Sequence, residues 1–277
     1  MSSSMIRPTV AVWKFASCDG CQLTVLDCED ELLAIAAALD IRMFLEAGPS
    51  ELLEHYDVSL VEGSVTTAHD AQRIQEIRAR SGLLVTIGAC ATAGGVQALR
   101  NGANIDEFCS VVYARPDWIE TLATSTPIAA HVTVDHELRG CPISKRELLA
   151  TITALLARRR LPLTAHSVCV ECKQAANTCV LVAHGTPCLG PVTHGGCDAL
   201  CPSFDRGCFG CFGPSESANV DGLRTALLAA GTGDDVLIRL LRTFNAGAPA
   251  FGDAAARYSA GHAPPAADGD ARGALRP

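Results

Sequence analysis

The sequence predicts an α/β domain built on a parallel sheet, followed by an irregular region that bound metal would organise. Three observations support this prediction. Short apolar runs alternate with helical patterns through the first half of the chain, which is typical of βαβ units. Residues 165–214 then hold eight cysteines among many glycines and prolines, with little periodicity. Helical patterning returns over residues 219–245.

The predicted strands are short apolar runs that end in turn residues. Such runs are typical of strands that are buried in a parallel sheet. They cover residues 9–15, 41–47, 57–64 and 83–90, and residues 128–135 are expected to add a further strand.

The predicted helices carry apolar residues at helical spacing, over residues 23–39, 68–81 and 143–160. The last of these ends in three arginines, which are favourable at a helix C-terminus. We expect a first domain over residues 1–160 and a second over 161–245. The Ala-, Gly- and Pro-rich residues 246–277 are predicted to form a mobile tail.

Composition restricts the kinds of protein that this chain can be. Its 277 residues are 48% hydrophobic with a formal net charge of −8, which suits a sizeable core and does not suit binding to a nucleic acid. No apolar run reaches the roughly 20 residues of a membrane helix, and the N-terminus lacks an export signal. We therefore expect a cytoplasmic protein with no membrane span and no nucleic-acid partner. In that reducing compartment, 14 cysteines favour metal ligation over disulfides.

Four cysteines of the first half lie at predicted strand ends or turns. Cys18 and Cys21 follow the first strand, Cys90 ends the 83–90 run, and Cys141 lies at the turn into the last helix. Strand ends share one edge of a doubly wound sheet, so we expect the four thiols to converge. Four thiolates suit either an iron–sulfur cluster or a zinc ion. The pair Cys18 and Cys21, taken alone, also suits a redox dithiol.

The remaining cysteines fall into two classes. Cys28 and Cys109 lie among apolar neighbours and are predicted to be buried structural residues. The other eight have the spacing of two four-ligand metal sites; they are Cys169, Cys172, Cys179, Cys188, Cys197, Cys201, Cys208 and Cys211. Because spacing alone does not separate zinc from iron–sulfur, a zinc-organised cysteine-rich scaffold or binding protein stays open as an alternative.

Six sequence motifs carry a family resemblance. They are SCDGCQLTVLD, VEGSVTT, IGACATAGGVQ, GCPISKREL, CVECKQAANTC and PCLGPVTHGGCDALCPSFDRGCFGCFGP. Together they resemble the small subunit of nickel–iron hydrogenases, over residues 8–245 and in order. The resemblance is greatest to the cytoplasmic, multimeric branch that includes sulfhydrogenase delta subunits and bidirectional NADP-linked enzymes. It implies a flavodoxin-like parallel-sheet domain, followed by an irregular domain that iron–sulfur clusters organise.

The resemblance also implies three iron–sulfur clusters, all [4Fe-4S]. The implied ligands of the proximal cluster are Cys18, Cys21, Cys90 and Cys141. The implied ligands of the distal cluster are Cys169, Cys172, Cys179 and Cys188. The implied ligands of the medial cluster are Cys197, Cys201, Cys208 and Cys211. Exported members of the family have histidine at the Cys169 position and often proline in place of a fourth medial ligand. Whether Cys188 and Cys197 belong to the distal or to the medial set stays open.

The function that the resemblance implies is an electron relay. Hydrogen is split at a nickel–iron centre that belongs to a partner large subunit, and this chain carries the electrons through its clusters to further flavin or iron–sulfur subunits. We expect the acceptor to be NAD(P)-linked. The enzyme is therefore the complex, a hydrogen:acceptor oxidoreductase.

The resemblance also implies that Glu62, in the VEGS motif, lies near the subunit interface and is a candidate for proton movement, with a loop or capping carboxylate as the alternative. For the chain as a whole, a related cluster subunit with another acceptor is the remaining alternative. Such a subunit of the quinone-reductase type lacks the second cysteine-rich half, so residues 165–214 argue against it.

Overall fold

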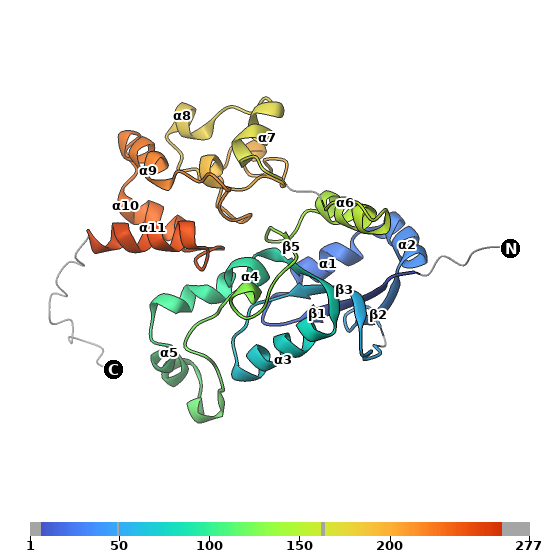
Figure 1. Cartoon of the computed structure of the whole chain (residues 1–277). Coiled ribbons are helices and arrows are strands. Elements are labelled where there is room, and N and C mark those ends of the chain that lie inside the picture. Colours follow the sequence, from blue (N-terminus) through green and yellow to red (C-terminus); the bar gives the residue numbers. More distant parts are fainter. Residues whose placement is uncertain (1–6, 49, 162–163, 262–277) are drawn as a thin grey trace, which may run out of the picture.

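One parallel sheet forms the centre of the first half of the chain (Figure 1). The computed structural model describes residues 7–48, 50–161 and 164–261. The strands of the sheet are β1 (Thr9–Lys14), β2 (Asp40–Phe44), β3 (Tyr56–Glu62), β4 (Ser81–Ile87) and β5 (His136–Leu138). Their order is β2-β1-β3-β4-β5 and every neighbouring pair is parallel. Because this is the strand order of the flavodoxin-like fold, the predicted fold class is confirmed.

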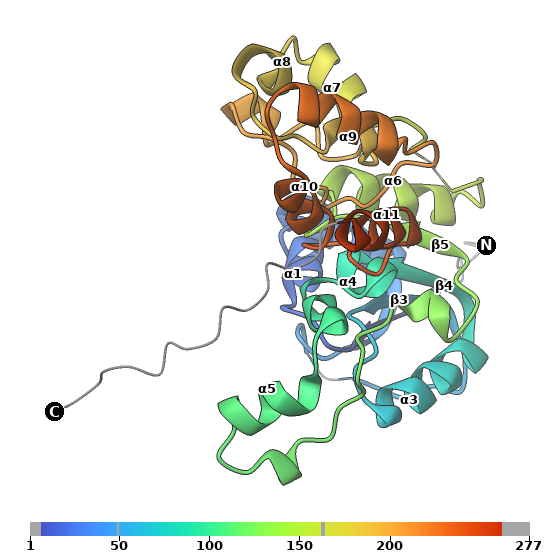
Figure 2. The same ribbon diagram turned by 90° about the vertical axis from the view of Figure 1, so that its left-hand side faces the viewer.

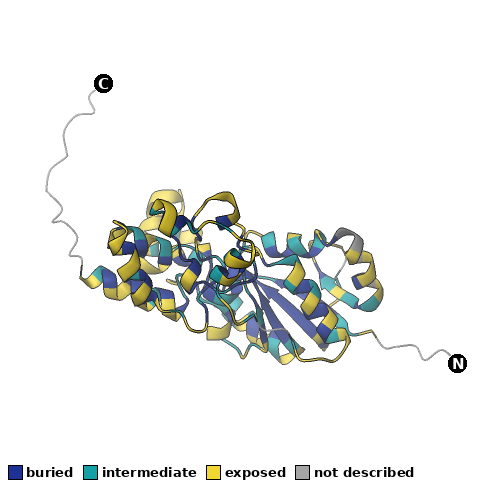
Figure 3. Cartoon of the chain, turned by 90° about the horizontal axis from the view of Figure 1, so that it is seen from above, coloured by how far each residue is buried: buried dark blue, intermediate teal, exposed yellow. Residues whose placement is uncertain are grey.

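Helices cover both faces of this sheet. Alternate residues of β1 point to opposite faces. Val10 therefore packs with α1 (Gly20–Leu26), α2 (Glu29–Ala38) and α6 (Lys145–Leu156), whereas Trp13 packs with α3 (Ala68–Ala79) and α4 (Gly88–Ala93). The strands are accordingly buried between more exposed helices (Figure 3). This half also contains α5 (Ile105–Val112).

Two local predictions for this half were wrong in detail. The helix expected over residues 23–39 is two helices, because the chain turns at Asp27 and Cys28. The strand expected over residues 128–135 is absent from its place: Ile128–Ala130 forms a 3₁₀ turn, and the last strand begins at His136. The apolar run there instead supplies a fully buried Ile128 to the core under α3 and α4.

The second half is built around cysteine-bearing loops. Two short helices, α7 (Val168–Gln174) and α8 (Val180–His184), lie within these loops. Three further helices bury a core of their own; they are α9 (Val220–Ala229), α10 (Asp234–Leu241) and α11 (Pro249–Ala260). Figures 1 and 2 show this half beside α6 and α4. A hydrogen bond from the Gly247 amide to the Ala93 carbonyl (3.2 Å) joins it to the end of α4.

The prediction of a mobile tail from residue 246 was wrong for its first part. Helix α11 lies within the expected tail, and Phe251 and Tyr258 are buried there. Small residues such as Ala254 and Ala255, which suggested a tail by composition, are fully buried and let the helix pack closely. Residues 262–277 of the expected tail lie outside the described residues. Across the part of the chain that is described, no helix is both long and apolar enough to cross a bilayer.

Candidate metal centres

The four cysteines of the first half meet at the carboxyl edge of the sheet. Cys18 and Cys21 lie between β1 and the first turn of α1, and Cys90 lies in α4 directly after β4. Cys141 follows β5. Burial, together with the nearby Cys141 and Cys18 thiols, raises the pKa of Cys90 to about 11. The topology therefore brings together the four thiols that the sequence singled out.

Glycines let the backbone approach these thiols closely. A Cβ atom at Gly88 would lie 2.5 Å from the Cys21 Sγ, and one at Gly95 would lie 2.5 Å from the Cys90 Sγ. Both glycines have positive φ angles, which residues with a side chain rarely adopt. The space beside the thiols is thus free of side chains at these two points. Four thiols beside backbone that no side chain covers fit an iron–sulfur cluster, whose sulfurs accept hydrogen bonds from nearby amides.

Glu62 anchors the loop that carries the first cysteine pair. It ends β3 and is 2% exposed. One carboxylate oxygen accepts the backbone N–H of Cys21 (3.0 Å), and the other accepts the side-chain amide of Gln22 (2.6 Å). Burial raises the pKa of Glu62, and these two hydrogen bonds oppose that rise. The contacts are those of a carboxylate that holds the start of α1 in place.

Gln22 is a site residue that the sequence reasoning missed. Gln22 is 1% exposed, and its side-chain amide donates a hydrogen bond to Glu62. The sequence does contain a sign of this role: a polar residue directly follows the second cysteine, at a position where the helical pattern predicts a buried side chain. A polar side chain in such a place needs a partner, but local sequence does not say which.

The first group of the second half comprises four cysteines on and after α7. Its members are Cys169, Cys172, Cys179 and Cys188. Burial, together with the thiols of the other three members, raises the pKa of Cys169 to about 11. A Cβ atom at Gly190 would lie 3.3 Å from the Cys188 Sγ and 3.5 Å from the Cys169 Sγ. This group therefore has the same features as the first: clustered thiols and a glycine beside them.

The remaining group lies between the other two. Burial, together with the thiols of Cys197, Cys141 and Cys201, raises the pKa of Cys211 to about 12. Cys141 belongs to the group at the sheet edge, so these two groups are neighbours.

Cys208 makes the corresponding connection on the other side. Its backbone N–H lies 3.2 Å from the Cys188 Sγ as a hydrogen-bond donor, and burial raises its own pKa, with further contributions from Cys188 and Cys211. The thiols thus form a continuous series from the sheet edge through the Cys197–Cys211 group to the Cys169–Cys188 group. This proximity is also why sequence order alone could not divide the last eight cysteines.

Cys28 and Cys109 stand apart from these groups. Cys28 is fully buried in the sheet core and its thiol faces the Thr24 carbonyl at 3.6 Å, and Cys109 is also buried. The prediction that both are buried is confirmed. Among the described residues, no group of three or more His, Cys, Asp or Glu side chains is placed so that it could hold a single metal ion.

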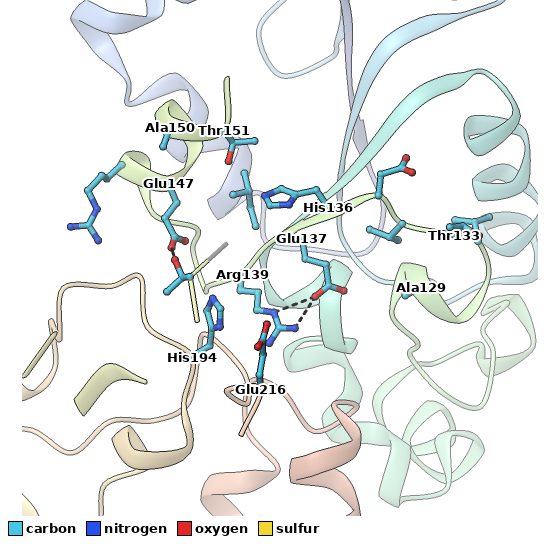
Figure 4. Close-up of a pocket in the computed structure, with 16 residues that line it drawn as sticks. Ala129, Thr133, His136, Glu137, Arg139, Glu147, Ala150, Thr151, His194 and Glu216 are labelled. Carbon is cyan, nitrogen blue, oxygen red and sulfur yellow. Dashed lines mark hydrogen bonds and ion pairs between the residues drawn. The ribbon is translucent and has the colours of Figure 1, made fainter. Parts of the chain in front are cut away.

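A separate cavity of about 610 Å³ lies along β5 and α6 (Figure 4). His136 and Thr151 line it, and within the described ranges the His136 Nε2 and Thr151 Oγ1 atoms have no hydrogen-bond partner. Figure 4 shows Arg139 paired with Glu137 at its side, with N···O distances of 3.1–3.2 Å. None of the described residues that line the cavity is a cysteine, so the thiol groups lie outside it.

Known proteins are similar to this chain in sequence and in fold. Residues 18–155 match the family described as the NADH ubiquinone oxidoreductase 20 kDa subunit. The chain is 36% identical to the sulfhydrogenase 2 subunit delta of Pyrococcus furiosus over 85% of this chain and 98% of that protein. It is 30% identical to a subunit of the F420-non-reducing hydrogenase of Methanocaldococcus jannaschii, over 82% of this chain and 89% of that one.

A solved structure is similar to part of the chain. The crystal structure of an NAD⁺-reducing [NiFe]-hydrogenase in the H₂-reduced state contains a chain with 26% identity and a TM-score of 0.53. The match covers 57% of this chain and 96% of that chain.

Proposed function

Since the chain belongs to the family of hydrogenase small, electron-transfer subunits, we propose that it relays electrons between the hydrogen-splitting site of a large subunit and an acceptor subunit. The chain is a component of a hydrogenase, and the nickel–iron centre would belong to the partner alone. The continuous series of three thiol groups is the observation that supports the relay. A relay needs neighbouring carriers, and each group in this series is next to another.

Each group would hold one [4Fe-4S] cluster. The proximal ligands would be Cys18, Cys21, Cys90 and Cys141; the distal ligands Cys169, Cys172, Cys179 and Cys188; and the medial ligands Cys197, Cys201, Cys208 and Cys211. When bound, such clusters accept and release single electrons at potentials that hydrogen bonds, charge and exposure adjust. The chain's own contribution is to desolvate the thiols and to present amides to them. Burial raises the pKa of eight of these twelve thiols, including Cys90, Cys169 and Cys211, and metal binding would displace those protons.

The large subunit would dock beside the proximal group. Cys18 is exposed while its companion Cys21 is buried, so this group opens on one side. Apolar side chains near that side are also exposed, among them Leu23 on α1 and Val96 and Leu99 after α4. Exposed apolar residues next to an open metal group suit an interface with a partner protein.

The acceptor end would lie at the distal group. We propose that further subunits with flavin or iron–sulfur cofactors receive the electrons there and pass them to NAD(P), in the cytoplasm. The names of similar proteins do not agree on one acceptor: one is called NAD⁺-reducing, and others are called F420-non-reducing, which names no acceptor. The acceptor is therefore tested separately from the relay.

Glu62 would serve the proximal group in two ways. Its hydrogen bonds support an anchoring role for the Cys21 loop. Its burial at the sheet edge beside that group is what supports a role in proton movement. Replacing Glu62 by Gln keeps the shape and one acceptor oxygen, so slowed hydrogen turnover with intact iron would favour the second role over the first.

The proposed function is tested by purifying the chain with its partners from cells grown with iron. We expect co-purification of a nickel-containing large subunit, acid-labile sulfide, and visible absorption that bleaches when hydrogen is supplied. NAD(P) reduction on adding hydrogen would identify the acceptor. A colourless preparation with zinc as its metal would contradict the relay and favour a zinc-organised scaffold. A red-brown preparation that hydrogen does not bleach would favour a cluster subunit of another oxidoreductase.

A further inference from the structure

A buried carboxylate links two of the thiol groups. Glu171 lies on α7 between Cys169 and Cys172, in the helix that carries the distal group. Its side chain is 6% exposed. It contacts a different loop, the one that carries Cys197.

The contacts of Glu171 bracket Cys197. One carboxylate oxygen accepts the backbone N–H of Gly196 (2.6 Å), and the other accepts the backbone N–H of Ala199 (3.2 Å). The second oxygen also lies 3.9 Å from the Cys197 Sγ. Both amides belong to the turn that contains Cys197: Gly196 precedes Cys197 in the chain and Ala199 follows it.

That turn needs an external support. Gly196, Asp198 and Ala199 have φ angles of 129°, 55° and 51°, a conformation that residues with a side chain rarely adopt. The turn belongs to no helix or strand, so regular backbone pairing does not hold it. Hydrogen bonds from amides to a carboxylate are among the stronger ones in proteins. Here the Gly196 and Ala199 amides both donate to the Glu171 side chain, which therefore supports the turn.

Two basic side chains lie near the Glu171 carboxylate. His166 Nε2 lies 3.3 Å from the carboxylate, and Arg146 Nη2 lies 4.0 Å away. Arg146 also pairs with Asp198 of the same turn at 2.5 Å. The carboxylate is therefore satisfied by two backbone amides, with the His166 ring and the Arg146 guanidinium beside it, and it does not itself point to a metal.

We propose that Glu171 is a positioning residue that presents the Cys197 thiol to the medial group. Resting on the proposed function, this makes Cys197 the fourth medial ligand and makes the medial cluster a four-iron cluster. It also means that the helix of the distal group shapes the medial group. The medial cluster then depends on a residue that is not among its ligands.

The test compares Glu171→Ala with Cys197→Ala in the purified complex. We expect both variants to lose about one iron per chain and to show the same electron paramagnetic resonance signal of an oxidised three-iron cluster, which oxidised four-iron clusters lack. The double variant should lose no more iron than Cys197→Ala alone, because Glu171 acts through that thiol. Glu76→Ala, which removes an exposed carboxylate on α3, serves as the matched control and should keep the wild-type iron and spectrum.

A milder variant keeps the inference testable if Glu171→Ala does not assemble. Glu171→Gln retains one acceptor oxygen and removes the charge near the Cys197 sulfur. We expect it to keep its iron and to raise the reduction potential of one cluster, because a reduced cluster is more negative and the repelling charge is gone. A purely structural residue would leave that potential unchanged.

Three results would overturn the inference. These are full iron with an unaltered spectrum in Glu171→Ala, loss of the whole distal cluster in place of one medial iron, or unchanged potentials in Glu171→Gln. Absence of iron–sulfur clusters from the wild-type complex would instead contradict the proposed function, so the two failures are distinguishable.

Discussion

Replacing Cys18 or Cys28 by serine separates ligand thiols from structural ones. The two residues lie at opposite ends of α1, so a general disturbance of that helix affects both variants. Cys18 is exposed at the open side of the proximal group, whereas Cys28 is fully buried in the sheet core. The division of the cysteines predicts opposite outcomes for the same chemical change.

The expected magnitudes follow from these surroundings. In Cys28→Ser the new hydroxyl can donate to the Thr24 carbonyl that the thiol already faces at 3.6 Å. The cost is then the burial of a polar atom that has one partner, about 1–2 kcal/mol, which is small against a typical stability of about 5–15 kcal/mol. Removing even an outer-shell partner of a metal ligand commonly costs about 10–100-fold in metal affinity or activity. Loss of the ligand Cys18 should therefore reduce hydrogen-driven activity by about 100-fold or more.

The assay is hydrogen-driven reduction of a viologen dye by the purified complex, normalised to the nickel of the large subunit. We expect Cys28→Ser to stay within about twofold of wild type and Cys18→Ser to lose nearly all activity together with part of its iron. Co-purification of the large subunit in both variants controls for assembly. Equal activities in the two variants, whether high or low, would refute the division of the cysteines.

Three further predictions concern stability. Glu62→Leu leaves two buried donors without an acceptor and should lower the free energy of unfolding by about 2–5 kcal/mol; a urea midpoint equal to that of wild type would count against the anchoring role. Phe251→Ala empties a site that is 1% exposed and should cost about 3–5 kcal/mol, whereas the exposed neighbour Asp253→Ala should change little, and equal effects would mean that α11 contributes nothing. Burial lowers the pKa of His136, so the folded state binds fewer protons than the unfolded state and stability should fall as the pH drops below the ordinary value of 6.5. Urea unfolding at about pH 7.5 and about pH 5.5 should show a smaller acid loss for His136→Leu than for wild type, and identical losses would contradict the assignment.

Local pattern was a good guide to the sheet and a poor one to what covers it. Alternation of apolar runs and helical spacing predicted four of the strands to within a few residues, because burial in a parallel sheet requires nearly continuous apolar runs. The same reasoning wrongly predicted a strand over residues 128–135. An apolar run indicates that a segment is buried, but it does not indicate whether the segment is a strand of the sheet or part of the layer that covers it. The reasoning misread residues 246–260 as well, because alanines that look featureless in sequence are what lets α11 pack closely.

The sequence by itself determined the chemistry of this protein: the cysteines, their spacing, and the parallel order of strands that directs the first four to one edge. Those properties depend on residue type and short-range pattern, which can be read without coordinates. Only the tertiary structure placed the three thiol groups next to one another in space, and only it showed the Gln22–Glu62 hydrogen bond and the hydrogen bonds from the Cys197 turn to Glu171. These hydrogen bonds join segments separated by 25 residues or more, and they form only when packing brings the segments together.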